Sequence, residues 1–255
     1  MPAPTPPNYS ARFQDSTAVA AYESKEYGAG SYASCIWSQQ WPVVEKIVTD
    51  FRGGRSGPVR LLDFACGTGR VISNLEALVD SADGVDISPN MVAVAQGKCR
   101  RASLRVGDIL TEPELLEGKF DLITAFRFLL NVEPSVRRQV LEKLRGVLRA
   151  PDGLLIVNVH GNSRSLRHPA IVWRRRRERT QPTGAMLNEM SPPETKALLA
   201  DCGFQIVQQF GFGILPPTIY RTPLRGLAKW TDGSLAGENC LRNLSIDMML
   251  VCRPV

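Results

Sequence analysis

Three carboxylates in the first half of the chain, Asp63, Asp86 and Asp108, each stand at the end of a short apolar run. Runs of this length and β-branched character are typical of buried strands. In open parallel sheets, ligands bind beyond the carboxyl ends of the strands, where such side chains gather. A carboxylate there can accept hydrogen bonds from ligand hydroxyl groups, so the three positions predict one shared ligand site.

A glycine-rich turn, residues 63–69 (DFACGTG), follows the first of these runs. Because glycine has no Cβ, the backbone of such a turn can approach a ligand closely. A dinucleotide fingerprint beginning at Gly67 needs another glycine at position 72, which is Ile72 here. The turn therefore disfavours pyrophosphate binding of the kind seen with nicotinamide cofactors.

The same turn resembles motif I of the class I S-adenosylmethionine-dependent methyltransferases, in which acidic-x-G-x-G-x-G cradles the cofactor. Ala65 replaces the first glycine of that motif, a small-for-small change. Residues 84–96 (GVDISPNMVAVAQ) are similar to the family's second motif, and residues 104–109 and 120–126 resemble its third and fourth. Four motifs in the family's order are a specific resemblance.

The resemblance implies S-adenosyl-L-methionine as the cofactor, with its ribose on Asp86 and its adenine beside Asp108 and Ile109. The residues that it assigns to the cofactor are Tyr27, Asp63, Ala65, Cys66, Gly67, Thr68, Gly69, Asp86, Ile87, Met91, Gly107, Asp108, Ile109 and Phe126.

The resemblance also implies an α/β fold of the Rossmann-like class I methyltransferase type, with a seven-stranded, mostly parallel sheet and helices on both faces. The implied strand order is 3-2-1-4-5-7-6, with strand seven antiparallel. Apolar patterns place strands near residues 59–64, 82–86, 104–109, 120–126, 154–160, 204–207 and 246–252. Helical patterns cover residues 36–51, 71–78, 134–148 and 191–200, and Ser88 with Pro89 opens another helix.

At 255 residues, the chain is long enough for one substantial core, and we expect a single domain. Within it we expect an N-terminal arm and helical lid at 1–55 and a cofactor-binding core at 56–162. A basic insertion at 163–190 and the C-terminal part of the sheet at 191–255 follow.

The acceptor should lie beyond strands four and five. Residues 125–131 (AFRFLLN) lack the D/N-P-P-Y string of the nucleobase amino-methyltransferases, so a DNA amine is not the expected acceptor. His160 ends strand five, where a base could take the proton of an attacking hydroxyl. The other interpretation of His160 is that it only caps the strand or packs. The residues that we assign to the acceptor are Tyr32, Trp37, Arg127, Asn131, Asn162 and Arg164.

Aromatic residues recur every five positions at Tyr22, Tyr27, Tyr32 and Trp37. Such spacing is more often core packing than ligand contact. The alternative is a lid over cofactor and acceptor, as methyltransferases of this class often have. In such a lid, a phenol such as that of Tyr27 would donate a hydrogen bond to the methionine carboxylate of the cofactor.

The net charge of +6 has a local origin. One window, from Arg164 to Arg179, contains seven arginines and the single acid Glu178, so it alone carries +6. The window is either a solvated basic helix or a site for an anion, which could be an acidic acceptor or an anionic membrane surface. Because the rest of the chain is neutral overall, nucleic acid is not an expected partner.

No apolar run approaches the roughly 20 residues that a membrane span needs, and the first residues (MPAPTPPNYS) do not resemble a signal peptide. We therefore expect a cytoplasmic protein. Its six scattered cysteines suggest reduced thiols and no metal site.

The expected activity is methyl transfer to a small-molecule acceptor, at a hydroxyl of a sugar-, lipid-linked or secondary-metabolite substrate. An N-methyltransferase and a non-catalytic cofactor-binding protein are the alternatives. The sequence leaves the oligomeric state open.

Overall fold

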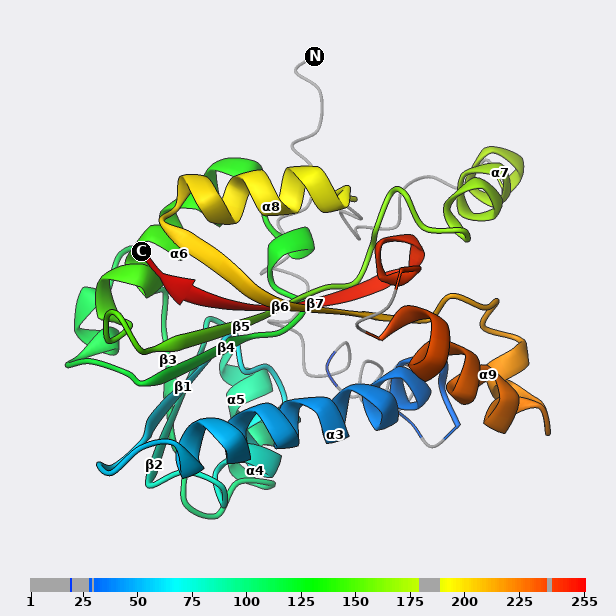
Figure 1. Cartoon of the computed structure of the whole chain (residues 1–255). Coiled ribbons are helices and arrows are strands. Elements are labelled where there is room, and N and C mark those ends of the chain that lie inside the picture. The colour runs from blue at the N-terminus through cyan, green and yellow to red at the C-terminus, as the bar shows by residue number, and fades with distance from the viewer. Residues whose placement is uncertain (1–18, 20–27, 29, 179–188, 238–239) are drawn as a thin grey trace.

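The computed structural model describes Val19, Gly28 and residues 30–178, 189–237 and 240–255. A seven-stranded sheet in the order β3-β2-β1-β4-β5-β7-β6 runs through this part of the chain (Figure 1). Its strands are β1 (Arg60–Phe64), β2 (Ser81–Asp86), β3 (Ser103–Val106), β4 (Leu122–Ala125), β5 (Leu154–Val159), β6 (Phe204–Phe212) and β7 (Asp247–Pro254). Neighbours from β3 to β5 are parallel, and β7 is antiparallel to both β5 and β6. The predicted fold class, strand order and orientation are confirmed.

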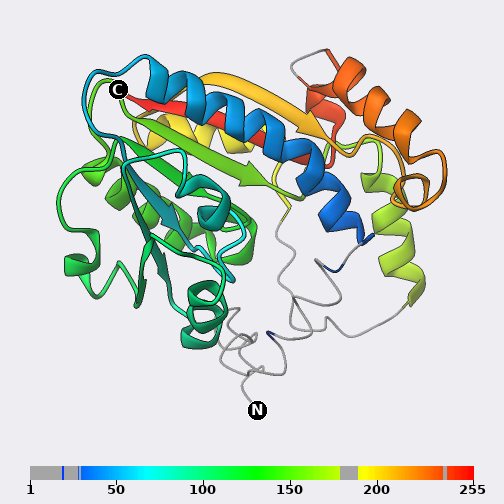
Figure 2. The ribbon, with the colours of Figure 1, turned by 90° about the horizontal axis from the view of Figure 1, so that it is seen from below.

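Helices cover both faces of the sheet, as predicted. One face carries α6 (Pro134–Val147) and α8 (Pro192–Asp201), and the other carries α3 (Tyr32–Gly53), α4 (Ile72–Leu75) and α5 (Pro89–Gln96). Each face has its own buried apolar cluster. Figure 2 shows α3 crossing the sheet on its lower face, and apolar side chains of β5, β6 and β7 pack against it. The sheet is therefore covered except at the ends of its strands.

The helix starts follow from local capping. The Ser31 hydroxyl accepts a hydrogen bond from the N–H of Ser34 at the start of α3, and that of Ser88 does so from Met91 at α5. At α8, Ser191 and Glu194 form a complete capping box. These contacts fix the residues at which α3, α5 and α8 begin.

Several element bounds differ from the sequence expectation. The chain leaves β3 at Val106, because Gly107 begins the turn that carries Asp108, and α4 stops at Leu75. β6 continues to Phe212, well beyond the expected end, because its whole length pairs with β7. α3 begins at Tyr32 and continues through Pro42.

The remaining elements, with one exception, lie beyond the carboxyl ends of the parallel strands. They are α7 (His168–Glu178), α9 (Arg225–Thr231), the 3-10 turns η2 (Pro113–Leu116), η3 (Leu129–Asn131), η4 (Ile219–Arg221) and η6 (Arg242–Leu244), and the π turn η5 (Asp232–Ala236). Only η2 departs from this placement, since it joins β3 to β4. Among the described residues, no helix combines the length and apolar character needed to cross a membrane.

Candidate cofactor and acceptor site

A cavity of about 260 Å³ lies at the carboxyl ends of β1, β2, β3 and β4. β1 lies between β2 and β4, so the chain reverses its direction of winding at this point of the sheet. The cavity lining includes nine residues that the sequence assigns to the cofactor: Ala65, Gly67, Asp86, Ile87, Met91, Gly107, Asp108, Ile109 and Phe126. The predicted motifs thus meet around one space.

Asp86 holds the glycine turn in place. Its Oδ2 accepts a hydrogen bond from the N–H of Gly67 at 2.8 Å, and its Oδ1 accepts one from the N–H of Ser88 at 2.9 Å. Burial raises the pKa of this carboxyl, and the two N–H donors act in the opposite direction. The carboxylate is therefore positioned at the cavity wall by backbone donors from two elements.

Asp63 lies behind the cavity wall, where it supports the turn. Its Oδ1 accepts a 2.6 Å hydrogen bond from the Thr124 hydroxyl, and its Oδ2 accepts one from the N–H of Ile72 at 3.2 Å. Burial raises its pKa to about 7. Asp63 connects β1, β4 and the start of α4, and it does not line the cavity.

The backbone of the turn needs small residues. Gly69 has φ +78°, and a Cβ there would lie 2.8 Å from the Cβ of Ala95 in α5. Ala65 has φ +55°, a left-handed conformation that costs an L-residue roughly 1–2 kcal/mol. The position where the family motif has glycine therefore carries strain in this chain.

The other residues assigned to the cofactor have supporting positions. The Cys66 N–H donates to the carbonyl of Val85 and ties the turn to β2. Cys66, Thr68 and Gly69 lie outside the cavity lining. Tyr27 lies outside the described residues.

On the acceptor side, Arg127 and Asn131 line the same cavity. Arg127 follows β4 with φ +56°, and its carbonyl accepts a hydrogen bond from the Asn131 amide. Left-handed non-glycine residues held by surrounding contacts often mark ligand sites. Sequence reasoning overlooked the apolar residues that complete this wall, which are Phe64, Leu110, Phe128, Val132, Val136 and Val140. Their apolar periodicity indicated only core packing.

Trp37 joins α3 to both halves of the site. Its ring lies 5.9 Å from that of Phe126 in an edge-to-face arrangement, and the guanidinium of Arg70 lies 4.5 Å from its centroid. Arg70 follows the glycine turn directly, and Phe126 lines the cavity. Trp37 is therefore next to the site, one layer behind the lining.

His160 lies just beyond β5, on the same face of the sheet as α3. Its Nδ1 is buried without a hydrogen-bond partner among the described residues. Burial lowers the pKa of the imidazole well below its usual range, and the charges of Arg127 and Arg70 lower it further. The ring is therefore neutral near pH 7, and it is a weak base there.

Sequence reasoning missed a second titratable group on this face, Asp247 at the start of β7. Its Oδ1 accepts hydrogen bonds from the side-chain amides of Gln40, at 2.9 Å, and Asn158. Burial raises its pKa to about 7, and Arg127 and Arg70 oppose that rise. An acid that opens an otherwise apolar strand was the available sequence signal.

Tyr32 and Asn162, both assigned to the acceptor, have structural contacts instead. Arg167 donates a hydrogen bond to the Tyr32 hydroxyl and lies over its ring, which meets the ring of Tyr220 edge-to-face. The Asn162 amide donates to the carbonyls of Asn243 and Ser245, and its Oδ1 accepts from the N–H of Arg164. These contacts use both amide protons of Asn162, so its assignment to the acceptor is not supported. Neither Asn162 nor Arg164 lines the cavity.

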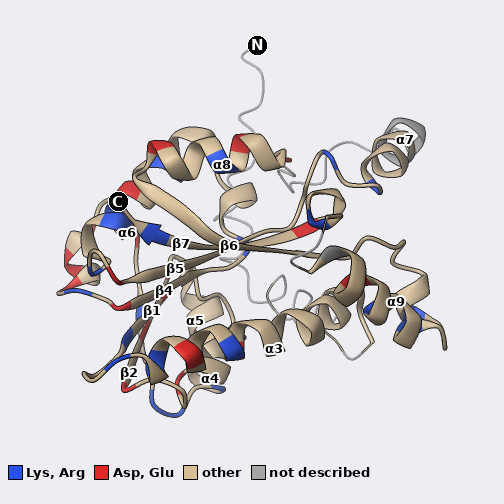
Figure 3. Cartoon of the chain, viewed as in Figure 1, with Lys and Arg blue, Asp and Glu red and all other residues tan. Residues whose placement is uncertain are grey.

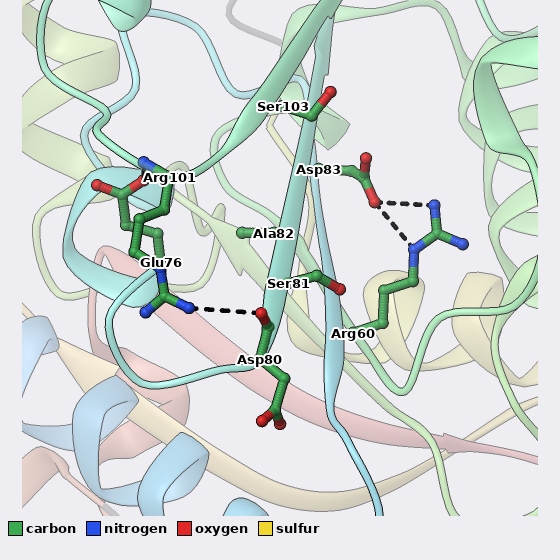
Figure 4. Close-up of a pocket in the computed structure, with 8 residues that line it drawn as sticks. All are labelled: Arg60, Glu76, Asp80, Ser81, Ala82, Asp83, Arg101 and Ser103. Carbon is green, nitrogen blue, oxygen red and sulfur yellow. Dashed lines mark hydrogen bonds and ion pairs between the residues drawn. The ribbon is translucent and has the colours of Figure 1, made fainter.

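A second cavity, of about 300 Å³, lies at the opposite ends of β1, β2 and β3 (Figure 4). Its charged side chains have partners within the protein. Arg60 pairs with Asp83 at 2.9 Å, and Arg101 donates to the backbone carbonyl of Asp80. The Glu76 carboxylate accepts hydrogen bonds from three consecutive backbone N–H groups. The polar groups of this cavity support the loops around the strand starts.

Comparison with known proteins finds matches for the central part of the chain. Residues 61–153 match a family model described as a methyltransferase domain. A protein of Geobacillus sp. (strain WCH70) with a methyltransferase name is 37% identical over 111 residues, which is 42% of this chain and 44% of that protein. The Bacillus subtilis (strain 168) protein YqeM, also with a methyltransferase name, is 30% identical over 107 residues, or 40% and 43% of the two chains. The matches thus span under half the length of these curated relatives.

Solved structures extend the likeness to nearly the whole fold. Magnesium protoporphyrin IX methyltransferase of Synechocystis PCC 6803, solved with bound S-adenosylhomocysteine, has a TM-score of 0.64 at 17% identity and covers 96% of this chain and 98% of its own. An O-methyltransferase family protein of Burkholderia thailandensis has a TM-score of 0.58 at 14% identity, with 94% and 60% covered. The same Synechocystis enzyme has also been solved with S-adenosylmethionine. At these identities the solved structures show that the fold is shared.

Proposed function

We propose that this protein is a class I S-adenosylmethionine-dependent methyltransferase that transfers the methyl group to a small-molecule acceptor, because its central part matches a methyltransferase family model and two relatives with methyltransferase names. The observation that carries the proposal is the single cavity that collects residues from all four sequence motifs. In the proposed mode, Asp86 accepts hydrogen bonds from the ribose, Ile87 and Ile109 contact the adenine, and Asp108 lies at its amino edge. Gly67 lets the backbone approach the cofactor.

We propose a hydroxyl oxygen as the methyl acceptor. Methyl transfer to a hydroxyl requires loss of its proton as the oxygen attacks, so a base must lie beside the transfer centre. His160 is the base expected from the sequence, but its lowered pKa makes it weak near neutral pH. Asp247, with a pKa raised to about 7, is better matched to that task, because a base works best when its pKa is near the working pH. Neither side chain lines the cavity, but both are near Arg127, which does, and we therefore propose Asp247 as the proton acceptor and keep His160 as its rival.

The proposed acceptor is anionic. Arg127 lines the cavity, and both Arg127 and Arg70 lie close enough to lower the pKa values of His160 and Asp247. These two arginines on the acceptor side favour a negatively charged acceptor there, although Glu133 also lines the cavity. Sugar-linked, lipid-linked and secondary-metabolite acceptors with an acidic group all fit this description. We propose the cytoplasm as the compartment, because all six cysteines are free thiols.

An N-methyltransferase, which needs only to position an amine, is the second candidate function. The carboxylate of Asp247 is compatible with N-methylation, since a carboxylate can also orient an amine. A non-catalytic cofactor-binding protein is the third, and inertness toward every acceptor would favour it.

The deciding experiment uses S-adenosylmethionine with an isotopically labelled methyl group and a metabolite extract from the source cell. A product one labelled methyl heavier, identified by mass spectrometry, would establish transfer. The carbon chemical shift of the labelled methyl would then distinguish attachment to oxygen from attachment to nitrogen. Calorimetric binding of S-adenosylhomocysteine without any labelled product would support the non-catalytic reading instead.

A further inference from the structure

The helix α9 presents an apolar stripe to solvent. Leu224, Leu227 and Trp230 are spaced three residues apart, so they share one side of the helix, and they are 59%, 57% and 65% exposed. In a helix of a globular domain such a stripe normally faces the core. Here only Ala228 of the helix is buried. The apolar side therefore lacks a partner among the described residues.

The other side of α9 is basic. Arg225 and Lys229, four residues apart, and Arg221 just before the helix are all exposed. Asp232, the acid directly after the helix, is buried, and its carboxylate accepts hydrogen bonds from the N–H groups of Gly213 and Ile214. Figure 3 shows basic positions along α9. An exposed Leu/Trp stripe flanked by cations only is typical of helices that lie in the headgroup region of a membrane.

A second segment repeats this composition. Leu166, two residues before α7, is 57% exposed, and Trp173 within α7 is 61% exposed. Four arginines follow Trp173 in the sequence. Figures 1 and 2 both place α7 and α9 at the same end of the molecule, beyond the carboxyl ends of the parallel strands. The two segments therefore flank the end of the sheet where the cavity opens.

The start of α3 links the two segments. The guanidinium of Arg167, just before α7, lies 4.7 Å from the ring centroid of Tyr32, and that ring lies 5.6 Å from the ring of Tyr220, just before α9. The Cys35 thiol also contacts the carbonyl of Tyr220. These contacts bring the segments that precede α7 and α9 together at the start of α3.

The geometry points to a membrane-docking face formed by residues 221–235 and 164–173, which binds the headgroup region of a bilayer containing anionic phospholipid. A specific protein partner fits less well, because α9 is only seven residues, about 10 Å, long, whereas a stable interface buries about 800 Å² on each partner. The docked orientation would point the cofactor cavity's acceptor side toward the lipid surface. This inference concerns binding alone and does not depend on methyl transfer.

Vesicle co-sedimentation of the full-length protein tests the inference, with phosphatidylcholine vesicles that contain or lack phosphatidylglycerol. Wild type should bind the anionic vesicles. Leu227→Gln with Trp230→Gln should lower the partition coefficient at least about tenfold, because apolar insertion is lost. Arg225→Gln with Lys229→Gln should lower it about 30-fold on anionic vesicles only, from roughly 1 kcal/mol for each cation near such a surface.

Lys143→Gln with Lys196→Gln is the matched control, because it removes two exposed cations from α6 and α8 on the upper face. This control should bind like wild type. Equal loss in the control would overturn the inference, as would unchanged vesicle binding in both α9 variants with unaltered thermal unfolding. Self-association of wild type that Trp230→Gln abolishes, without vesicle binding, would show that a second copy of the chain covers the stripe and would also overturn it.

Discussion

The cofactor half of the site and the acceptor half are assembled over very different distances along the chain. On the cofactor side, the hydrogen bond from Gly67 to Asp86 spans 19 residues, and that from Ile72 to Asp63 spans nine. On the acceptor side, the bond from Gln40 to Asp247 spans 207 residues, that from Arg167 to Tyr32 spans 135, and that from Cys35 to Tyr220 spans 185. The first half lies within residues 63–126 and its longest such bond, from Thr124 to Asp63, spans 61 residues, whereas the second joins α3 near the start of the chain to β7 near its end.

This difference indicates which half of the site can change when the acceptor changes. The backbone turn constrains the cofactor half. Its residue types are restricted by steric contacts, as at Gly69, or by hydrogen bonds, as at Asp63 and Gly67. The acceptor half is held by side chains from α3, β5, β7 and the segment before α7. Side-chain contacts of that kind can change one at a time without disturbing the turn.

The largest effect should come from Asp247→Asn, which acts on the acceptor half alone. Asp247 becomes a carboxylate, and hence a base, as the pH rises through about 7, so wild-type turnover should rise over that interval. The variant should lose about 10²- to 10⁴-fold in turnover together with the pH limb, and should keep its affinity for S-adenosylhomocysteine. A pH–rate profile of each protein is the measurement.

His160→Gln is the matched comparison for that profile. Because its imidazole is already neutral near pH 7, its loss should leave the limb near pH 7 in place. If the limb disappears in His160→Gln and persists in Asp247→Asn, then His160 is the base and the assignment to Asp247 is wrong.

Next in size is Gly69→Val, which tests the local character of the cofactor half. The new Cβ would meet Ala95 at 2.8 Å, and φ is +78°, so the turn and α5 would have to separate. We expect a loss of about 3 kcal/mol or more in unfolding free energy, measured by urea denaturation. Gly53→Ala in α3, where no atom lies within 4 Å of the new Cβ, is the control and should be neutral or slightly stabilising. Equal stability of the two variants would contradict the steric argument.

Asp86→Ala should weaken S-adenosylhomocysteine binding by about 1.5–3 kcal/mol, or roughly 10- to 150-fold, because charge-assisted hydrogen bonds to the ribose and to Gly67 are lost. Isothermal titration calorimetry provides the affinity. Asp247→Asn, from the other half of the site, should bind like wild type in the same assay. A similar loss in both variants would mean that the two halves are not separable.

The smallest effect should come from Ala65→Gly. Glycine adopts φ +55° without the strain that alanine carries, but it also gives the unfolded chain more freedom, so the two effects partly cancel. We expect a change within about 1 kcal/mol in unfolding free energy and unaltered cofactor affinity. A large destabilisation, seen by urea denaturation, would indicate that the Ala65 methyl packs in a way that φ alone does not explain.

The sequence by itself located most strands of the sheet and the motifs of the cofactor half, and the resemblance to the methyltransferase family implied the strand order. Apolar periodicity located the strands, and the spacing from Asp63 to Gly69 with Asp86 and Asp108 at strand ends located the cavity. These signals are local, because a turn residue and a strand-end acid reveal their role through their immediate neighbours in the chain. The exceptions were bounds such as the end of β6, which pairing with β7 extends to Phe212.

Only the tertiary structure decided what the acceptor half contains. Tyr32 and Asn162 were plausible ligands by position, yet Arg167 with Tyr220 engages the first, and two backbone carbonyls engage the second. Asp247 stood inside an ordinary strand pattern, and its proximity to Gln40 and Asn158 depends on the antiparallel pairing of β5 with β7. The exposed stripe of α9 was also invisible, since periodicity shows that a helix has an apolar side and the packing of the other elements decides whether that side is covered.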